Sequence, residues 1–501
     1  AVDYPPATRM KAKLQTAADA AGIAALSQKS PGFLAASVMT GNGTVTAGVT
    51  DANNVFDANM SGITGYQNLV RGSTVTKTGI KLAATVTYTA DVPVSFLKVM
   101  GFQKLTVTGA SSSAASLPPY LDFYLTLDVS GSMGLASTPA EQTRLSQINP
   151  DNYRQYPTGC TFACHFAPQN SACTNTGTQG YPTNNYCLGY AISRVSQSGY
   201  TSLLMTNTSN PKQQQLPTGI VSGLPNSLYA PKNSGPKSGL TGGGLTAVPN
   251  CKAAGTDECI QLRLDAVGYA VTELFKTANE SKKVPDQFRI GLYPFIRFLY
   301  AYFPLTKNIN GLPTTPGTIN YAAANLATLL DTNINTDLGS GGTHISAALT
   351  SVNGLISGGS GAVGDGSTPT TPQPYVFLVT DGAQNNQVKG VPNGSWSGSN
   401  HATTIDSQNS LTTVPSCETL KNRGVKVSVL YIPYQKIDPV NTSFAGNEGT
   451  YANENIQYIP ASLRKCASSP DFFRTANTPQ EIQDALDAMF KHALQTAHIT
   501  H

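Results

Sequence analysis

The sequence predicts an α/β protein with a doubly wound, mostly parallel sheet and a long disulfide-rich insertion, preceded by an N-terminal helix and a small antiparallel β domain. Apolar strands alternate with amphipathic helices after residue 119, and residues 33–118 are rich in Val, Thr and Ser. Six of the eight cysteines lie between residues 160 and 259. The regions we expect are 1–32, 33–118, and 119–501 with insertions at about 135–257 and 384–415.

The composition argues against several classes of function. Of the 501 residues only 12% are charged, and the formal net charge is +4. Because no run of Lys or Arg is present, binding of nucleic acid is not expected. No apolar stretch reaches the length of about 18 residues that spans a bilayer, so we expect membrane contact only through a helix absent from this chain. The chain begins at Ala1 without Met, which fits a processed end or an arbitrary boundary.

The first 118 residues divide into a helix and a β segment. Residues 5–30 carry a stripe of mostly small apolar side chains at three- and four-residue steps. The stripe consists of Met10, Leu14, Ala17, Ala18, Ala21 and Ala25. Small side chains permit close approach, either to the helix's own domain or to a neighbouring subunit. From Phe33 to Pro118, alternation in "KLAATVTYTADVPVSF" and "KLTVTGAS" predicts short antiparallel strands.

The remainder of the chain has the pattern of a parallel sheet with crossover helices. The expected strands are 121–128, 288–295, 374–381 and 425–432, and the expected helices are 262–278, 344–356 and 416–424. A last helix follows a capping box of Thr478 and Glu481, with Pro479 at its first position. Both insertions leave from carboxyl ends of strands, where ligands bind in open α/β sheets.

A set of side-chain oxygens follows these strand ends. Asp128, Ser130 and Ser132 form D-x-S-x-S after the first strand, Thr343 precedes a helix, and Asp381 ends a later strand. Few carboxylates among several oxygens suit a hard divalent cation, Mg²⁺ first, with Ca²⁺ and Mn²⁺ as alternatives. The competing interpretation is structural: Asp128 caps a turn and Thr343 is the N-cap of its helix.

The same set favours adhesion over catalysis. A cation held largely by neutral hydroxyls keeps net positive charge, and an open position can accept a carboxylate from another protein. The sequence contains no H-E-x-x-H, P-loop or G-x-S-x-G motif. His344 is the one candidate acid or base beside the set, and a lone His at a helix start is more often structural. We therefore expect no enzymatic activity; a hydrolase using His344 and the metal is the alternative.

In chain order, D-x-S-x-S, the Thr of "SGGTHISAAL" and the Asp of "FLVTDG" resemble the metal-ion-dependent adhesion site of von Willebrand factor A domains. The resemblance covers roughly residues 120–500. It implies that the hydroxyls bind the metal directly and the acids bind partly through water. The ligands would be Asp128, Ser130, Ser132, Thr343 and Asp381. Because the first insertion leaves from the rim of this site, its body either covers the site, supplies a ligand, or leaves it open.

Four further segments resemble the TadE/TadG-like group of Tad (tight adherence) pilus-assembly proteins. They are "AVDYPPATRMKAKLQTAADAAGIAAL", "VPVSFLKVMGFQKLTVTGASSSAAS", "SCETLKNRGVKVSVLYI" and "LRKCASSPDFFRTANTPQEIQDAL". This resemblance implies an extracellular, cell-surface or cell-envelope protein whose partners are pilus components or a protein offering a carboxylate. The alternative is a structural subunit of a self-assembling filament, with the N-terminal helix and β domain making contacts between copies.

The eight cysteines form an even set, which favours disulfides in an exported protein. The rival interpretation is a zinc site at Cys160-x3-Cys164-His165, although no second close Cys/His pair completes four ligands. In the C-terminal half that resembles the TadE/TadG-like group, we predict a bridge between Cys417 and Cys466. We expect the others to bridge among themselves: Cys160, Cys164, Cys173, Cys187, Cys251 and Cys259.

Overall fold

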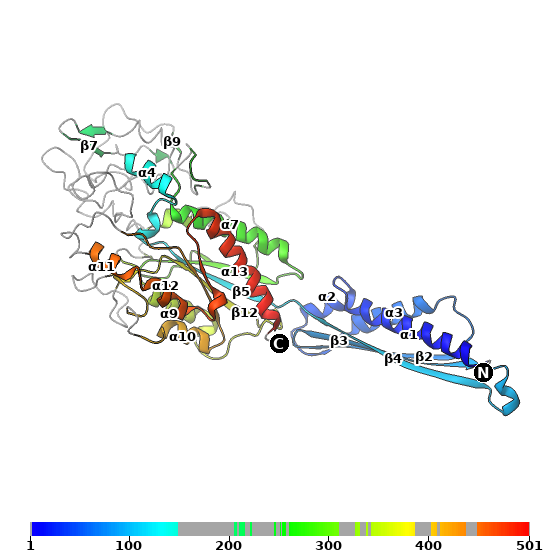
Figure 1. The fold of residues 1–501 in the computed structure, drawn as a ribbon. Coiled ribbons are helices and arrows are strands. Elements are labelled where there is room, and N and C mark those ends of the chain that lie inside the picture. The colour runs from blue at the N-terminus through cyan, green and yellow to red at the C-terminus, as the bar shows by residue number, and fades with distance from the viewer. Residues whose placement is uncertain are drawn as a thin grey trace.

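The computed structural model contains two regions, each with its own apolar core (Figure 1). It describes residues 3–148, 205–207, 210–215, 221–222, 245–246, 251, 253–256, 260–309, 326–330, 337–338, 342–385, 402–407, 411–436 and 448–499. Most of the predicted first insertion lies outside these residues, as do five of the six cysteines between residues 160 and 259. The disulfide-rich character of that insertion therefore stays a prediction.

The N-terminal region packs three helices against an antiparallel sheet with strand order β1-β2-β3-β4. Its helices are α1 (Tyr4–Leu26), α2 (Pro31–Val38) and α3 (Thr46–Met60). Its strands are β1 (Gly43–Thr44), β2 (Gln67–Thr78), β3 (Lys81–Pro93) and β4 (Lys104–Ser116), with the 3₁₀ turn η1 (Leu97–Met100) between β3 and β4. Alternate residues of β3 are buried, as expected for a sheet with one covered face.

Helix α1 packs on its own domain rather than presenting its stripe to solvent. Leu14 and Ala18 are fully buried, and the whole predicted stripe belongs to the N-terminal core. The Tyr88 hydroxyl of β3 donates a hydrogen bond to Gln15 Oε1 over 3.0 Å. Of the two alternatives for this stripe, packing within the domain is the one observed.

The expectation of short strands from residue 33 onwards was wrong for the first part of that segment. Residues 31–38 and 46–60 are helical, and the strands that follow are twelve or thirteen residues long. In α3, Ala52, Phe56 and Met60 recur every four residues and are buried. This helical period overrides the local Thr, Gly and Asn content that suggested turns.

The C-terminal region contains a six-stranded sheet in the order β11-β10-β5-β12-β15-β16. All neighbouring pairs are parallel except β10 and β11, so the parallel-containing α/β sheet is confirmed. The strands are β5 (Leu121–Asp128), β10 (Phe288–Phe295), β11 (Phe303–Thr306), β12 (Gln373–Thr380), β15 (Lys426–Tyr431) and β16 (Phe473–Thr475). Every residue of β5 and of β12 is buried, which requires cover on both faces.

Helices flank this sheet on two sides in Figure 1, with α7 and α13 on one side and α9, α10 and α12 on the other. The helices of this region are α4 (Pro139–Ile148), α7 (Arg263–Ser281), α9 (Ile345–Leu355), α10 (Pro415–Asn422), α11 (Glu448–Asn455), α12 (Ile459–Cys466) and α13 (Pro479–Ile499). The Thr478 hydroxyl accepts a hydrogen bond from the amide of Glu481, as the capping box predicts. The Glu481 carboxylate accepts one from the amide of Asn477, one residue before the expected position.

A disulfide joins Cys417 of α10 to Cys466 at the end of α12, the pair expected from the sequence, with 5.1 Å between the Cα atoms. Cys251 is also disulfide-bonded. The described part of the chain contains no free cysteine. Within it, no helix combines the length and the apolar character needed to cross a membrane.

The two regions meet at the connection that follows β4. The Tyr120 hydroxyl donates a 2.6 Å hydrogen bond to the Ser37 carbonyl of α2, and the Tyr120 amide donates to Gly366 of the C-terminal region. Tyr120 and Val284 both contribute to the N-terminal core. This junction is therefore packed rather than a solvated linker.

Candidate metal centre

The two acids of the predicted metal set lie at one edge of the sheet. Strands β5 and β12 are parallel neighbours, with Leu127 opposite Val379, so Asp128 and Asp381 follow at adjacent strand ends. The Thr380 hydroxyl donates a 2.6 Å hydrogen bond to Asp128 Oδ2, which joins the two ends directly. Both acids are buried. The convergence expected from the sequence is thus present for this pair.

The D-x-S-x-S turn brings two serines to the same place. The Ser130 amide donates a 3.0 Å hydrogen bond to Asp128 Oδ1, and the Ser130 and Ser132 hydroxyl oxygens lie 3.2 Å apart. The 3₁₀ turn η2 (Gly131–Gly134) follows and fixes this curvature. Ser130 is buried while Ser132 is partly exposed, so Ser132 is the member of the set with the most solvent contact. Asp128 does cap a turn, as the structural interpretation proposed, but only its Oδ1 takes part, by accepting the hydrogen bond from the Ser130 amide.

Asp381 carries the observation that bears most directly on a metal. Its side chain is 0% exposed, and neither carboxylate oxygen has a hydrogen-bond partner among the described residues. The Ser132 hydroxyl and the Ala383 amide face it without completing a hydrogen bond of normal geometry. A buried, unpartnered carboxylate costs several kcal/mol if it stays ionised, roughly 2–7 for a polar group and more for a charge. The site therefore fits a group that supplies positive charge.

Burial raises the pKa of both acids. For Asp381 desolvation is the largest cause, and the neighbouring Asp128 charge adds to it, opposed by Ser132 and by the Arg263 guanidinium. For Asp128 desolvation is again the largest cause, opposed by hydrogen bonds from Ser130 and Thr380. In the protein without a cation, the pair consequently holds protons at pH values where exposed aspartates are ionised.

Thr343 lies at the same sheet edge, between two strand ends. Its amide donates to Asn385 Oδ1 over 2.8 Å, and its carbonyl accepts from the Asn385 amide, just beyond β12. The next residue, His344, donates its amide to the Ile296 carbonyl, just beyond β10. The N-cap of α9 is His344 and not Thr343, so the structural alternative for Thr343 does not hold. The Thr343 side chain is buried and remains available for the predicted role.

Three residues at this edge were missed by the sequence analysis. The Thr380 hydroxyl donates a hydrogen bond to Asp128. The Asn385 side chain accepts one from the amide of Thr343. The buried Arg263 places its guanidinium near Asp381. Arg263 donates to the Pro433 carbonyl over 2.8 Å, and burial lowers its pKa while Asp381 opposes that change. Thr380 was detectable as the residue before Asp in "FLVTDG"; nothing in the sequence places Arg263 here.

Gly382 shapes the turn after Asp381. Its φ is 81°, a region that side chains other than glycine rarely adopt, and a Cβ there would clash with Ile459. The Gly382 amide donates to the Thr380 hydroxyl, the same group that donates to Asp128. The turn after Asp381 therefore requires glycine at this position.

His344, the alternative catalytic residue, is buried beside the set. Desolvation, with a smaller contribution from the Arg297 charge, lowers its pKa to about 4. It is therefore neutral at pH 7, and its Nδ1 has no hydrogen-bond partner within the described ranges. These properties describe a core imidazole near the strand ends.

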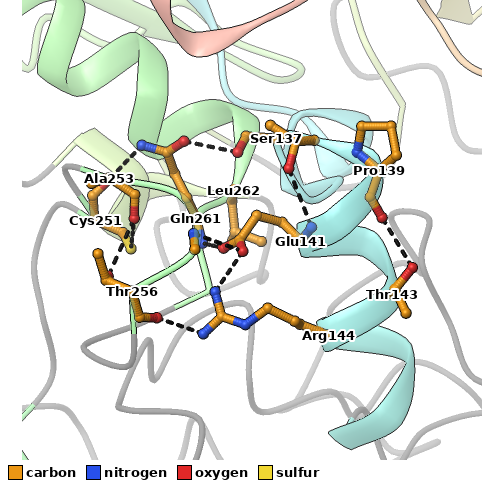
Figure 2. Close-up of polar contacts among 12 residues, drawn as sticks. Ser137, Pro139, Glu141, Thr143, Arg144, Cys251, Ala253, Thr256, Gln261 and Leu262 are labelled. Carbon is orange, nitrogen blue, oxygen red and sulfur yellow. Dashed lines mark hydrogen bonds and ion pairs between the residues drawn. The ribbon is translucent and has the colours of Figure 1, made fainter.

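The first insertion begins and ends in a hydrogen-bonded neck, formed by residues 135–144, 251, 253–256 and 260–265 (Figure 2). The buried Glu141 carboxylate accepts hydrogen bonds from the amides of Gln261 (2.7 Å) and Gly255 (3.0 Å). The Arg263 amide donates to the Leu135 carbonyl over 2.8 Å, next to the turn that carries Ser132. The neck is therefore anchored directly beside the turn that carries Ser132.

No arrangement of three or more His, Cys, Asp or Glu side chains suited to a metal occurs in the part of the chain that the structure describes. The predicted set is of another kind, because three of its five members are hydroxyls. Its donor atoms are of the type found in oxygen sites for hard cations rather than in His and Cys sites.

No family model and no curated protein matches the sequence. Similarity is found among solved structures. The PilB minor pilin from Streptococcus sanguinis is 12% identical, with 86% of this chain and 80% of that chain covered and a TM-score of 0.32. The von Willebrand factor domain of the type V pili tip protein Mfa5 from Porphyromonas gingivalis is 14% identical, covering 48% and 89%, with a TM-score of 0.28. A von Willebrand factor type A protein from Catenulispora acidiphila is 9% identical, covering 86% and 51%, with a TM-score of 0.28. Because these TM-scores are low, we base the description of the fold on the observed strand order alone.

Proposed function

We propose that this chain is a metal-dependent adhesion protein with a doubly wound domain of the von Willebrand factor A type. Asp128, Ser130, Ser132, Thr343 and Asp381 would hold one divalent cation, with Mg²⁺ preferred over Ca²⁺ and Mn²⁺. The unpartnered, buried carboxylate of Asp381 beside Asp128 is the observation that supports this most strongly.

The donor set indicates what kind of partner the site accepts. Two carboxylates formally neutralise a dication and the three hydroxyls add no charge, so the nearby Arg263 guanidinium would leave the occupied site with an excess of positive charge. A bound cation would supply a positively charged coordination position on the side of Ser132, which is partly exposed. A carboxylate from another protein matches that position in charge and in ligand type.

The resemblance to the TadE/TadG-like group supports a place on the cell surface or in the cell envelope, in association with pili. The partner would then be a pilus component or a surface protein that offers an Asp or Glu side chain. The filament-subunit alternative is weakened because the α1 stripe that was to contact a second copy is buried in its own domain.

Cation binding is tested by thermal unfolding of the full chain after EDTA dialysis, followed by titration with Mg²⁺, Ca²⁺ or Mn²⁺. We expect a rise in Tm that saturates with cation and is absent in Asp128→Ala. Asp471→Ala changes an exposed acid outside the site and serves as the matched control. The proposal would be contradicted if none of the three cations changed the Tm of the unsubstituted protein.

A further inference from the structure

The turn between β3 and β4 forms an exposed apolar tip, defined here as residues 94–103. In it, Phe96 is 62% exposed, Val99 88%, Met100 67% and Phe102 55%. Figure 1 places this hairpin turn at the end of the N-terminal region that points away from the C-terminal region. Large apolar side chains so exposed and so close together in sequence mark an interaction site.

The tip is held in a defined shape. The Asp3 carboxylate accepts hydrogen bonds from the amides of Ser95 (2.8 Å), Phe96 (2.9 Å) and Leu97 (2.7 Å). Gly101 closes the turn with a φ of 86°. The apolar side chains are therefore presented outwards by a fixed backbone.

The charged side chains near the tip in the sequence are mostly positive. Residues 3–13 and 94–104 contain five basic side chains and one acidic side chain. The basic residues are Arg9, Lys11, Lys13, Lys98 and Lys104. The single acid is Asp3, whose carboxylate is occupied by three backbone amides. Lys104 pairs with Asp91, just outside these ranges, so five basic side chains against two acidic ones leave a local excess of three positive charges.

We propose that the apolar tip inserts into the interface of a lipid bilayer that carries anionic headgroups. Apolar side chains would enter the acyl boundary while the surrounding Lys and Arg side chains contact the headgroups, each worth about 1 kcal/mol near an anionic surface. A standard-sized protein interface involves about 20–30 residues on each partner, whereas the tip offers four large exposed apolar side chains. A fluid bilayer needs no complementary groove.

This contact differs from the one expected from the sequence, which required a helix absent from this chain. It would also orient the molecule. The tip lies at one end of the protein and α4, which follows the metal set, lies near the other (Figure 1). A membrane-bound tip therefore directs the proposed adhesion site away from the membrane.

The test is flotation of the full chain with vesicles of phosphatidylcholine alone or with about one-third phosphatidylglycerol. We expect binding to the anionic vesicles that weakens as salt is raised. The combined variant Phe96→Ser, Val99→Ser, Met100→Ser and Phe102→Ser should lower the partition coefficient at least about tenfold. Leu355→Ser with Leu411→Ser removes exposed apolar side chains of the C-terminal region and is the control. Unchanged thermal unfolding shows that the variants fold.

A spectroscopic variant gives a second readout. Trp396 is the one tryptophan in the sequence, so Trp396→Phe with Val99→Trp reports on the tip alone. Its emission should shift to shorter wavelength on anionic vesicles. The proposal is overturned if the unsubstituted protein does not float, if the tip variant floats equally well, or if the emission does not move. Concentration-dependent self-association that the tip variant abolishes, without vesicle binding, would assign the tip to a second copy instead.

Discussion

The substitution Asp381→Asn tests whether Asp381 is a metal ligand or an acid with a structural role only. The substitution keeps the shape of the side chain and removes its charge, in a place where the carboxylate is 0% exposed and unpartnered among the described residues. Without cation, near neutral pH, we expect the free energy of unfolding to rise by about 1–3 kcal/mol, because a buried charge next to Asp128 is removed. With saturating cation, we expect the substitution to lower the free energy of unfolding instead.

The size of the reversal follows from linkage. A ligand present at 100 times its Kd stabilises a protein by about 2.7 kcal/mol. For a domain of this size each kcal/mol shifts Tm by about 2–4 °C, so saturating Mg²⁺ should raise the Tm of the unsubstituted protein by roughly 5–11 °C. Asp381→Asn should lose this response. The variant is thus the more stable protein in EDTA and the less stable one in Mg²⁺.

The assay is differential scanning calorimetry in EDTA and in Mg²⁺, with Asp122→Asn as the matched control. Asp122 is a buried aspartate of the same strand as Asp128, but it forms a bidentate ion pair with Arg289. Its loss should cost about 1 kcal/mol in either buffer, discounted because Arg289 is partly exposed, and leave the Mg²⁺ response intact. If Asp381→Asn destabilises equally in both buffers, the reasoning about an unpartnered carboxylate is refuted.

Three further predictions concern pH, the disulfide and the junction. Burial raises the pKa of both site acids, so the folded metal-free protein binds more protons than the unfolded chain. Its free energy of unfolding should therefore fall as the pH rises from about 4 to neutral. Over the same range the stabilisation by Mg²⁺ should grow, because the cation binds the deprotonated acids. Unfolding curves in EDTA and Mg²⁺ across that range check both signs. Replacing Cys417 and Cys466 by Ser opens a loop with a sequence separation of 49 and should cost about 4 kcal/mol in the chain-entropy model, measured by calorimetry. Tyr120→Phe removes the 2.6 Å hydrogen bond to the Ser37 carbonyl and should lower the stability of the N-terminal transition by about 1 kcal/mol, measured in urea; no change would show that water replaces the hydroxyl.

Continuous apolar runs predicted the central strands to within about a residue, because a strand buried on both faces needs little more than such a run. The strand 121–128 was predicted at the bounds of β5, and 288–295 at those of β10. The N-terminal segment of residues 33–118 was predicted less well. In α3 the apolar residues lie four apart among Thr, Asn and Gly, and the burial that favours a helix comes from contacts with α1 and β2.

By itself, the sequence determined which oxygens follow which strand, since D-x-S-x-S and the acid of "FLVTDG" are local patterns. Only the tertiary structure decided that Thr380 bonds to Asp128, that Arg263 lies near Asp381, and that the Asp381 carboxylate has no hydrogen-bond partner within the described part of the chain. The exposed apolar tip was equally invisible in the sequence, where Phe96 ends a segment expected to form a strand. The reason is physical: periodicity is a property of neighbours along the chain, whereas loss of water and proximity of charge depend on segments that folding brings together.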